Sequence, residues 1–132
     1  MQISASVKSS FNQHTVFVET NGDSKAIGIK AKANGYGSSI NGGELLLLAL
    51  ATCFCNDIYR EAVKRKIAVS EVEVICRGEF GSEGEPGKNF IYKAKVIADA
   101  PDEIIDEMIR YVDSIAEVHN TLRKGINVKL KN

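Results

Sequence analysis

The sequence predicts an α+β domain in which a mostly antiparallel sheet packs against helices, in the order βββ-α-ββ-α-β. Three observations support this fold class. Several segments carry apolar residues at every second position, two longer segments carry them at helical spacing, and Gly- or Asn-rich turns separate the segments. Because 132 residues is close to the common size of one domain, we expect residues 1–132 to fold as a single domain.

The N-terminal third is predicted to be β-structure. Residues 1–7 (MQISASV) alternate between apolar and polar, and residues 15–20 (TVFVET) are β-branched and aromatic. Residues 21–23 (NGD) are a strong turn signal. We therefore expect residues 26–31 (AIGIKA) to form a third strand that pairs with the second one in a hairpin.

The most distinctive segment is residues 45–55 (LLLLALATCFC), which has almost no polarity. A helix that is apolar all round needs cover on every side, and this run is shorter than the ~20 apolar residues that cross a bilayer. We expect a core helix that ends near Lys66 and holds Cys53 inside the protein or at an interface. A homodimer, in which a second copy of this helix lies near the two-fold axis, supplies the missing cover.

The second half of the chain supplies the remaining elements. Residues 69–80 alternate, with Val72, Val74 and Cys76 on one face. A proline and two acids at 101–103 are typical of a helix start. The other predicted segments are a strand at 90–98, a short helical piece at 118–123 and a last strand at 126–130.

Composition excludes several functional classes. Seventeen basic and seventeen acidic residues cancel, so no net field favours nucleic acid or anionic lipid. Three cysteines and the absence of an N-terminal signal pattern favour free thiols in a reducing cytoplasm. We expect no membrane or nucleic-acid partner and no cofactor. We also expect no metal, because Cys53, Cys55, His14 and His119 lack a second cluster at ligand spacing.

Residues 42–53 (GGELLLLALATC) resemble the central helix of the OsmC/Ohr family (osmotically inducible protein C and organic hydroperoxide resistance protein). Residues 120–123 (NTLR), followed by Gly125, resemble that family's C-terminal signature. The resemblance implies an OsmC-like fold, an intertwined homodimer and a thiol-dependent peroxidase. In this family a first cysteine attacks a hydroperoxide, a second closes a disulfide, and lipoyl-type dithiols are common reductants.

The resemblance assigns catalytic roles to two residues. Cys53 matches the peroxidatic cysteine, and Glu44 matches the acidic residue nine positions before it. Ala116 stands where the family has its second cysteine. The family's arginine belongs to the N-terminal hairpin region, but residues 1–33 contain no arginine. Lys8 or Lys25 are the remaining sources of that charge.

Each candidate also has a structural interpretation. A thiolate, not a thiol, attacks peroxides, and burial raises a thiol pKa from its usual ~8.5, so Cys53 is either the nucleophile or a core residue. Glu44 lies about 13–14 Å before Cys53 along a helix. It therefore acts from the other subunit or across a bend, or it only favours the helix start, with Ser39 or Asn41 as N-cap.

The other cysteines fit core positions, although either one is a possible second thiol. Cys55 points about 200° away from Cys53 on a helix, and Cys76 resolves a sulfenic acid only if its face meets Cys53. In the family, the second cysteine opens a Cys-Pro-Val-Ser-like motif. His119 stands at the place of its serine. We expect a one-cysteine peroxidase that reduces organic hydroperoxides in oxidative-stress defence and is regenerated by an external dithiol. The alternative is a non-catalytic homodimer that binds a small apolar ligand in its interface cleft.

Overall fold

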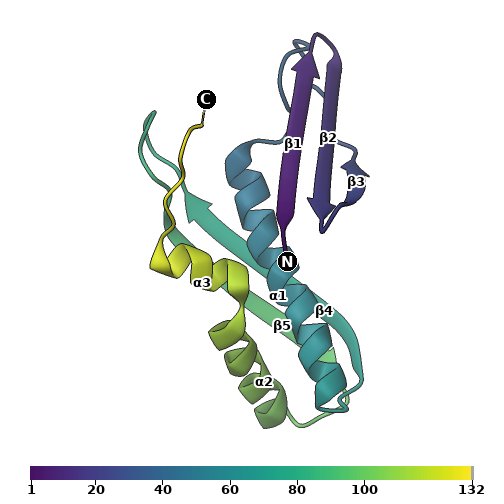
Figure 1. Cartoon of the computed structure of the whole chain (residues 1–132). Coiled ribbons are helices and arrows are strands. Elements are labelled where there is room, and N and C mark those ends of the chain that lie inside the picture. Colours follow the sequence, from purple (N-terminus) through teal and green to yellow (C-terminus); the bar gives the residue numbers. More distant parts are fainter. Residues whose placement is uncertain (132) are drawn as a thin grey trace. The chain divides into compact units, whose positions relative to one another are not determined.

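The computed structural model describes residues 1–131, and its elements follow in the order βββ-α-ββ-αα (Figure 1). This confirms the predicted α+β class and its antiparallel pairing. The elements are β1 (Ile3–Ser10), β2 (Gln13–Thr20), β3 (Asp23–Ile27), α1 (Gly42–Lys64), β4 (Val69–Glu79), β5 (Lys88–Ala98), α2 (Asp102–Ile115) and α3 (Glu117–Lys124).

The chain divides into two compact units, Met1–Leu45 and Leu46–Asn132. A single domain over the whole chain therefore stays a prediction. The first unit holds β1, β2 and β3, which form one antiparallel sheet in that order. Asn21 and Gly22 join β2 to β3 with φ angles of 49° and 86°, as a two-residue hairpin turn requires.

The third strand differs from its prediction. It occupies Asp23–Ile27 instead of residues 26–31. The turn fixes the register, because Thr20 pairs directly with Asp23 and the ladder then continues to the pair of Val16 and Ile27. The chain leaves the sheet at the next residue, so hairpin geometry outweighed the apolar pattern that suggested a later start.

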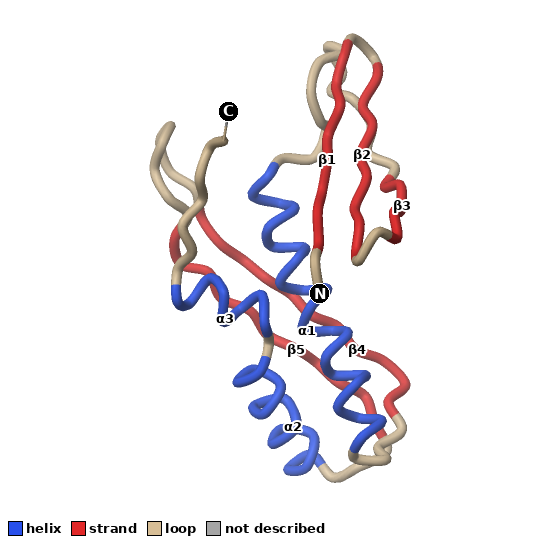
Figure 2. The backbone as a smooth tube through the Cα atoms, viewed as in Figure 1, coloured by secondary structure: helices blue, strands red, loops and turns tan. Residues whose placement is uncertain are grey.

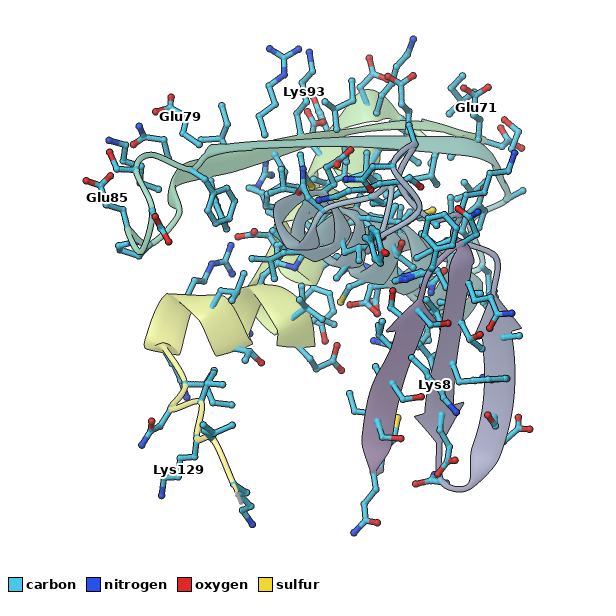
Figure 3. The ribbon with its side chains drawn as sticks, turned by 90° about the horizontal axis from the view of Figure 1, so that it is seen from above. Lys8, Glu71, Glu79, Glu85, Lys93 and Lys129 are labelled. Atoms are coloured by element: carbon cyan, nitrogen blue, oxygen red, sulfur yellow. The ribbon has the colours of Figure 1, made fainter. Side chains whose placement is uncertain are left out.

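The second unit packs helices on one face of the two-stranded sheet of β4 and β5 (Figure 2). Glu71, Glu79 and Lys93 point away from the helices (Figure 3). The opposite face carries Val72, Val74 and Cys76, as predicted, paired with Val96, Ala94 and Tyr92. The buried core is formed by Phe54, Ile58, Ala62, Met108, Val112 and Ala116.

Helix α1 is only partly covered in a single chain. Leu50 and Phe54 are buried, but Leu45 and Leu48 are exposed, so the prediction that the run is covered on every side is not met within one chain. By length and composition α1 is apolar enough to cross a membrane, with a mean hydropathy of 1.2 over its most apolar window. The core helix of a soluble protein can have the same length and composition.

The predicted last strand is wrong. In the part of the chain that the structure describes, residues after Gly125 form no strand. Ile126, Val128 and Leu130 are 70%, 88% and 97% exposed. An extended segment needs a neighbouring strand to pair its backbone, so the alternating pattern alone does not make a strand here.

Candidate functional site

Cys53 lies on α1 at the point where α3 begins. The backbone N–H of Val118 faces its sulfur and acts to lower the pKa of the thiol. Val118 is the second residue of α3, and the residue at the N-cap position, Ala116, offers no side-chain cap. The first N–H groups of a helix have no partner inside the helix. They favour negative charge, so this end of α3 is suited to a thiolate.

The carboxyl group of Asp57 faces the same sulfur. The Cys53 thiol donates to Asp57, with 3.8 Å between Sγ and Oδ2, one turn further along α1. Asp57 is only 3% exposed. The Arg60 guanidinium pairs with its other oxygen, Oδ1, at 2.7 Å. The thiol therefore lies beside a buried carboxylate that is held by a cation.

Glu117 completes the cluster from the first turn of α3. Its carboxylate lies 3.8 Å from the Arg60 guanidinium, and one ligand atom each from Cys53, Asp57 and Glu117 lies within 4.8 Å of the others. One sulfur and two oxygens can bind a divalent metal in principle. Arg60 already supplies the positive charge between the two carboxylates, so a metal would have to displace it.

The electrostatics of the cluster act against ionisation of the thiol. Burial, the largest cause, raises the pKa of Cys53, and the charges of Asp57 and Glu117 raise it further. The Val118 N–H acts in the opposite direction. Burial also raises the pKa of Asp57, while Arg60 lowers it. The carboxyl group is thus a stronger base than an exposed aspartate.

Glu44 lies at the start of α1. Its Oε1 accepts a hydrogen bond from the backbone N–H of Asn41 at 3.1 Å, and its own N–H donates to Asn41 Oδ1 at 2.8 Å. This reciprocal pair is a capping box. Of the two predicted N-cap residues, Asn41 is the one used.

The remaining cysteines are free. Cys53, Cys55 and Cys76 all carry free thiols and are half-buried. Burial raises the pKa of Cys76. Ala116, which stands at the place of the family's second cysteine, is completely buried in the core between α2 and α3.

His119 and its neighbours form a second polar group beside α3. Its ring lies 4.6 Å from that of Tyr92 and 5.8 Å from that of Phe54, measured between centroids. Neither ring nitrogen has a hydrogen-bond partner among the described residues, and burial lowers the pKa of His119. Tyr92 donates to Asp113, which also pairs with Arg123.

The residues of the NTLR segment have a structural role in this group. Arg123 donates to the Asp113 backbone oxygen at 2.9 Å and to Asn120 Oδ1 at 3.1 Å, and Asn120 donates to the Ser114 backbone oxygen at 3.0 Å. These bonds hold α3 against the end of α2. A pocket of about 110 Å³, whose lining includes Leu50, Phe90 and His119, lies beside them.

Sequence reasoning missed Asp57, Arg60 and Glu117. The charge-rich stretch from Arg60 to Lys66 is typical of a solvated helix end, so its pattern gives Arg60 no separate role. The available signal was the spacing of Cys53, Asp57 and Arg60, because residues three or four apart share a helix face. Glu117 gave no such signal, since it reaches the cluster only through tertiary packing.

Comparison with known proteins supports the fold independently. The family model described as "OsmC-like protein" matches residues 35–131. No curated protein matches the chain. An OsmC-like protein of unknown function from Vibrio cholerae has a TM-score of 0.65 at 14% identity, with 92% of this chain and 93% of that chain covered.

Two further solved structures are similar in the same way. An OsmC-like protein from Mycoplasma pneumoniae has a TM-score of 0.61 at 19% identity, covering 92% of this chain and 86% of that one. An organic hydroperoxide resistance protein OsmC from Legionella pneumophila has a TM-score of 0.57 at 19% identity, covering 98% and 94%. At these identities the likeness shows the fold. The family match shows membership: the chain belongs to the OsmC-like protein family.

Proposed function

We propose that this protein is a thiol-dependent peroxidase that reduces organic hydroperoxides through Cys53. The observation that carries the proposal is the location of a half-buried thiol at the uncapped N-terminus of α3, where the Val118 N–H acts to lower its pKa and Asp57 accepts its hydrogen bond. The helix N-terminus favours the thiolate that attacks an O–O bond, while burial and the two carboxylates raise the pKa of Cys53 overall. Family membership and the hydroperoxide-resistance names of solved relatives point to the same chemistry.

The proposed cycle uses one cysteine. The Cys53 sulfur attacks the hydroperoxide oxygen distal to the organic group, the O–O bond breaks, and the products are a Cys53 sulfenic acid and an alcohol. An external dithiol of the lipoyl type then returns two electrons to the sulfenic acid, and the products are the Cys53 thiol, water and the disulfide of the reductant. Leu47, Leu50 and Phe54 lie on α1 with Cys53, and apolar contact with residues of this kind would favour bulky organic substrates over hydrogen peroxide.

The working form in this proposal is a homodimer in the reducing cytoplasm. Leu45 and Leu48 leave apolar surface of α1 uncovered, and a second copy covers it through a two-fold interface. Glu44 then acts across the interface on the partner's thiol or on the cation that activates it. Substituting Glu44→Gln slows turnover only if this contact forms.

A non-catalytic binding protein is the second candidate. The observation in its favour is the raised pKa of Cys53, since a protonated thiol is a weak nucleophile. In this alternative, the dimer binds a small apolar ligand in its interface cleft. The two functions differ in whether hydroperoxide is consumed at all.

The deciding experiment measures cumene hydroperoxide consumption in the presence of a lipoyl-type dithiol. We expect Cys53→Ser to abolish consumption while its circular dichroism spectrum stays that of wild type. The matched controls are Cys55→Ser and Cys76→Ser, which retain activity in a one-cysteine cycle. Equal rates for wild type and Cys53→Ser would overturn the peroxidase and leave the binding protein.

A further inference from the structure

We propose that Asp57 is a catalytic residue of this site: it takes the proton from the Cys53 thiol as the sulfur attacks the hydroperoxide. The inference deepens the proposed peroxidase function and rests on it. It assigns the task of activating the thiol to a carboxylate on the same helix as the thiol, in a chain whose residues 1–33 contain no arginine.

The geometry suits a direct proton transfer. Asp57 Oδ2 lies 3.8 Å from Cys53 Sγ, with the thiol as donor. Both groups project from adjacent turns of α1, so the helix backbone itself fixes their separation. Because Asp57 is 3% exposed, bulk water competes little for its oxygens. A general base must come within hydrogen-bond reach of the proton that it removes, and such contacts are often longer in an unliganded site and shorten when substrate binds.

The neighbouring charges allow Asp57 to be ionised before it acts. The Arg60 guanidinium, on the same helix, lies 2.7 Å from Oδ1 of Asp57. The other carboxylate oxygen, Oδ2, faces the Cys53 thiol. Glu117 and His119 are the titratable groups that face Asp57 from α3. Glu117 raises the proton affinity of Asp57, and Arg60 limits the increase. The carboxylate is thus charged and basic at once.

The α3 N-terminus stabilises the charge that develops on sulfur. As the S–H proton moves to Asp57, the Val118 N–H donates to the sulfur. The S–O bond forms while the O–O bond breaks, so sulfur loses two electrons and the hydroperoxide gains them. Asp57 then gives its proton to the departing alkoxide, and the products are the Cys53 sulfenic acid and an alcohol.

The experiment distinguishes two roles of Asp57. In one it is the general base, and in the other it is only a negative charge that disfavours the Cys53 thiolate. Substituting Asp57→Asn removes a negative charge beside the sulfur, so the thiol pKa falls and more thiolate is present at neutral pH. If charge were the only role of Asp57, hydroperoxide reduction would become faster. If Asp57 is the base, reduction becomes slower by about 10²-fold, at the lower end of general-base contributions.

Two quantities are measured in a Cys55→Ser, Cys76→Ser background: the thiolate titration by ultraviolet absorbance and the single-turnover rate with cumene hydroperoxide against pH. We expect the wild-type rate to stay level below the thiol pKa, where Asp57 is ionised. We expect the rate of Asp57→Asn to rise tenfold per pH unit up to its own, lower thiol pKa. The matched control, Glu117→Gln, also removes a negative charge near the sulfur but keeps the level profile.

A measurement on the unaltered site covers the case in which Asp57→Asn does not fold. A primary solvent deuterium isotope effect on the single-turnover rate, below the thiol pKa, is expected for a proton in flight. An Asp57→Asn rate equal to or above wild type, or no isotope effect, overturns the role of Asp57 while leaving the peroxidase intact. A wild type that consumes no hydroperoxide overturns both.

Discussion

The Arg60 guanidinium lies 2.7 Å from the carboxylate of Asp57, and both side chains belong to α1. This pair places a positive charge two turns of helix away from Cys53, beside the carboxylate that the thiol contacts. A cationic partner therefore comes from the helix that carries the thiol. Lys8 and Lys25, the cations proposed from sequence, lie on β1 and β3.

Asp57 is expected to make stability depend on pH. Burial raises its pKa above the ordinary value of 3.8 in the folded chain. The folded state then holds this proton more tightly than the unfolded chain does. The contribution of Asp57 is fully present below the unfolded pKa and is lost as pH rises through the folded one. Urea unfolding from acid to neutral pH should show Asp57→Asn gaining stability relative to wild type, and a constant difference would contradict this.

Loss of the α1 cap should destabilise the protein. Substituting Asn41→Ala removes the oxygen that accepts the Glu44 N–H, and we expect the free energy of unfolding to fall by about 1 kcal/mol. Ser39→Ala is the matched control, because Ser39 was the other N-cap candidate and does not hold this bond. Urea denaturation measures both variants, and equal losses would argue against the capping box.

The aromatic contact of Phe54 is expected to dominate the core. Its ring is fully buried and meets Tyr92 edge-on at 4.9 Å between centroids. Substituting Phe54→Ala should cost about 3–5 kcal/mol of unfolding free energy. Val63→Ala, at a position on the same helix that is 77% exposed, should change it by less than about 0.5 kcal/mol. Thermal and urea unfolding provide the comparison.

The apolar face of α1 predicts the oligomeric state. We expect sedimentation to find a dimer at micromolar concentration, and Leu48→Glu to produce monomers because a charge then lies in the interface. Leu48 is 58% exposed in one chain. Val63→Glu adds the same charge to an exposed position near the other end of α1 and should leave the dimer intact. A well-folded wild-type monomer would refute the prediction.

Oxidation should stop at one cysteine. After treatment with cumene hydroperoxide, mass spectrometry should detect sulfenic or sulfinic acid at Cys53. Cys55 is two positions away on α1 and therefore points in a different direction, and Ala116 has no thiol. A stoichiometric disulfide between Cys53 and either Cys55 or Cys76 would replace the one-cysteine cycle with a two-cysteine one.

Sequence patterns predicted the elements that local chemistry determines. The turn at 21–23, the alternation of β4 and the helix start after Pro101 all involve residues close together in the chain. The order of the last elements was predicted less well, because a strand at 126–130 requires a pairing partner. Pattern alone cannot supply that partner.

The candidate site divides in the same way. The resemblance identified Cys53 and Glu44, but the surroundings of the thiol depend on how α3 packs against α1. Asp57 is a polar residue inside a largely apolar helix, and its spacing from Cys53 was visible. Glu117 and the Val118 N–H also act on the thiol, but they belong to the first turn of α3, more than sixty residues after Cys53 in the sequence.

The exposed segment from Ile126 to Leu130 has a consequence for the newly made chain. Its apolar residues alternate and its side chains are open to solvent, which is the pattern of an edge that templates further pairing. Until these apolar side chains are covered, we expect them to make the chain prone to self-association. The yield of native protein should therefore depend on how quickly two copies of the chain associate. We expect a higher yield when several ribosomes translate the same messenger RNA, because the new chains are then close together.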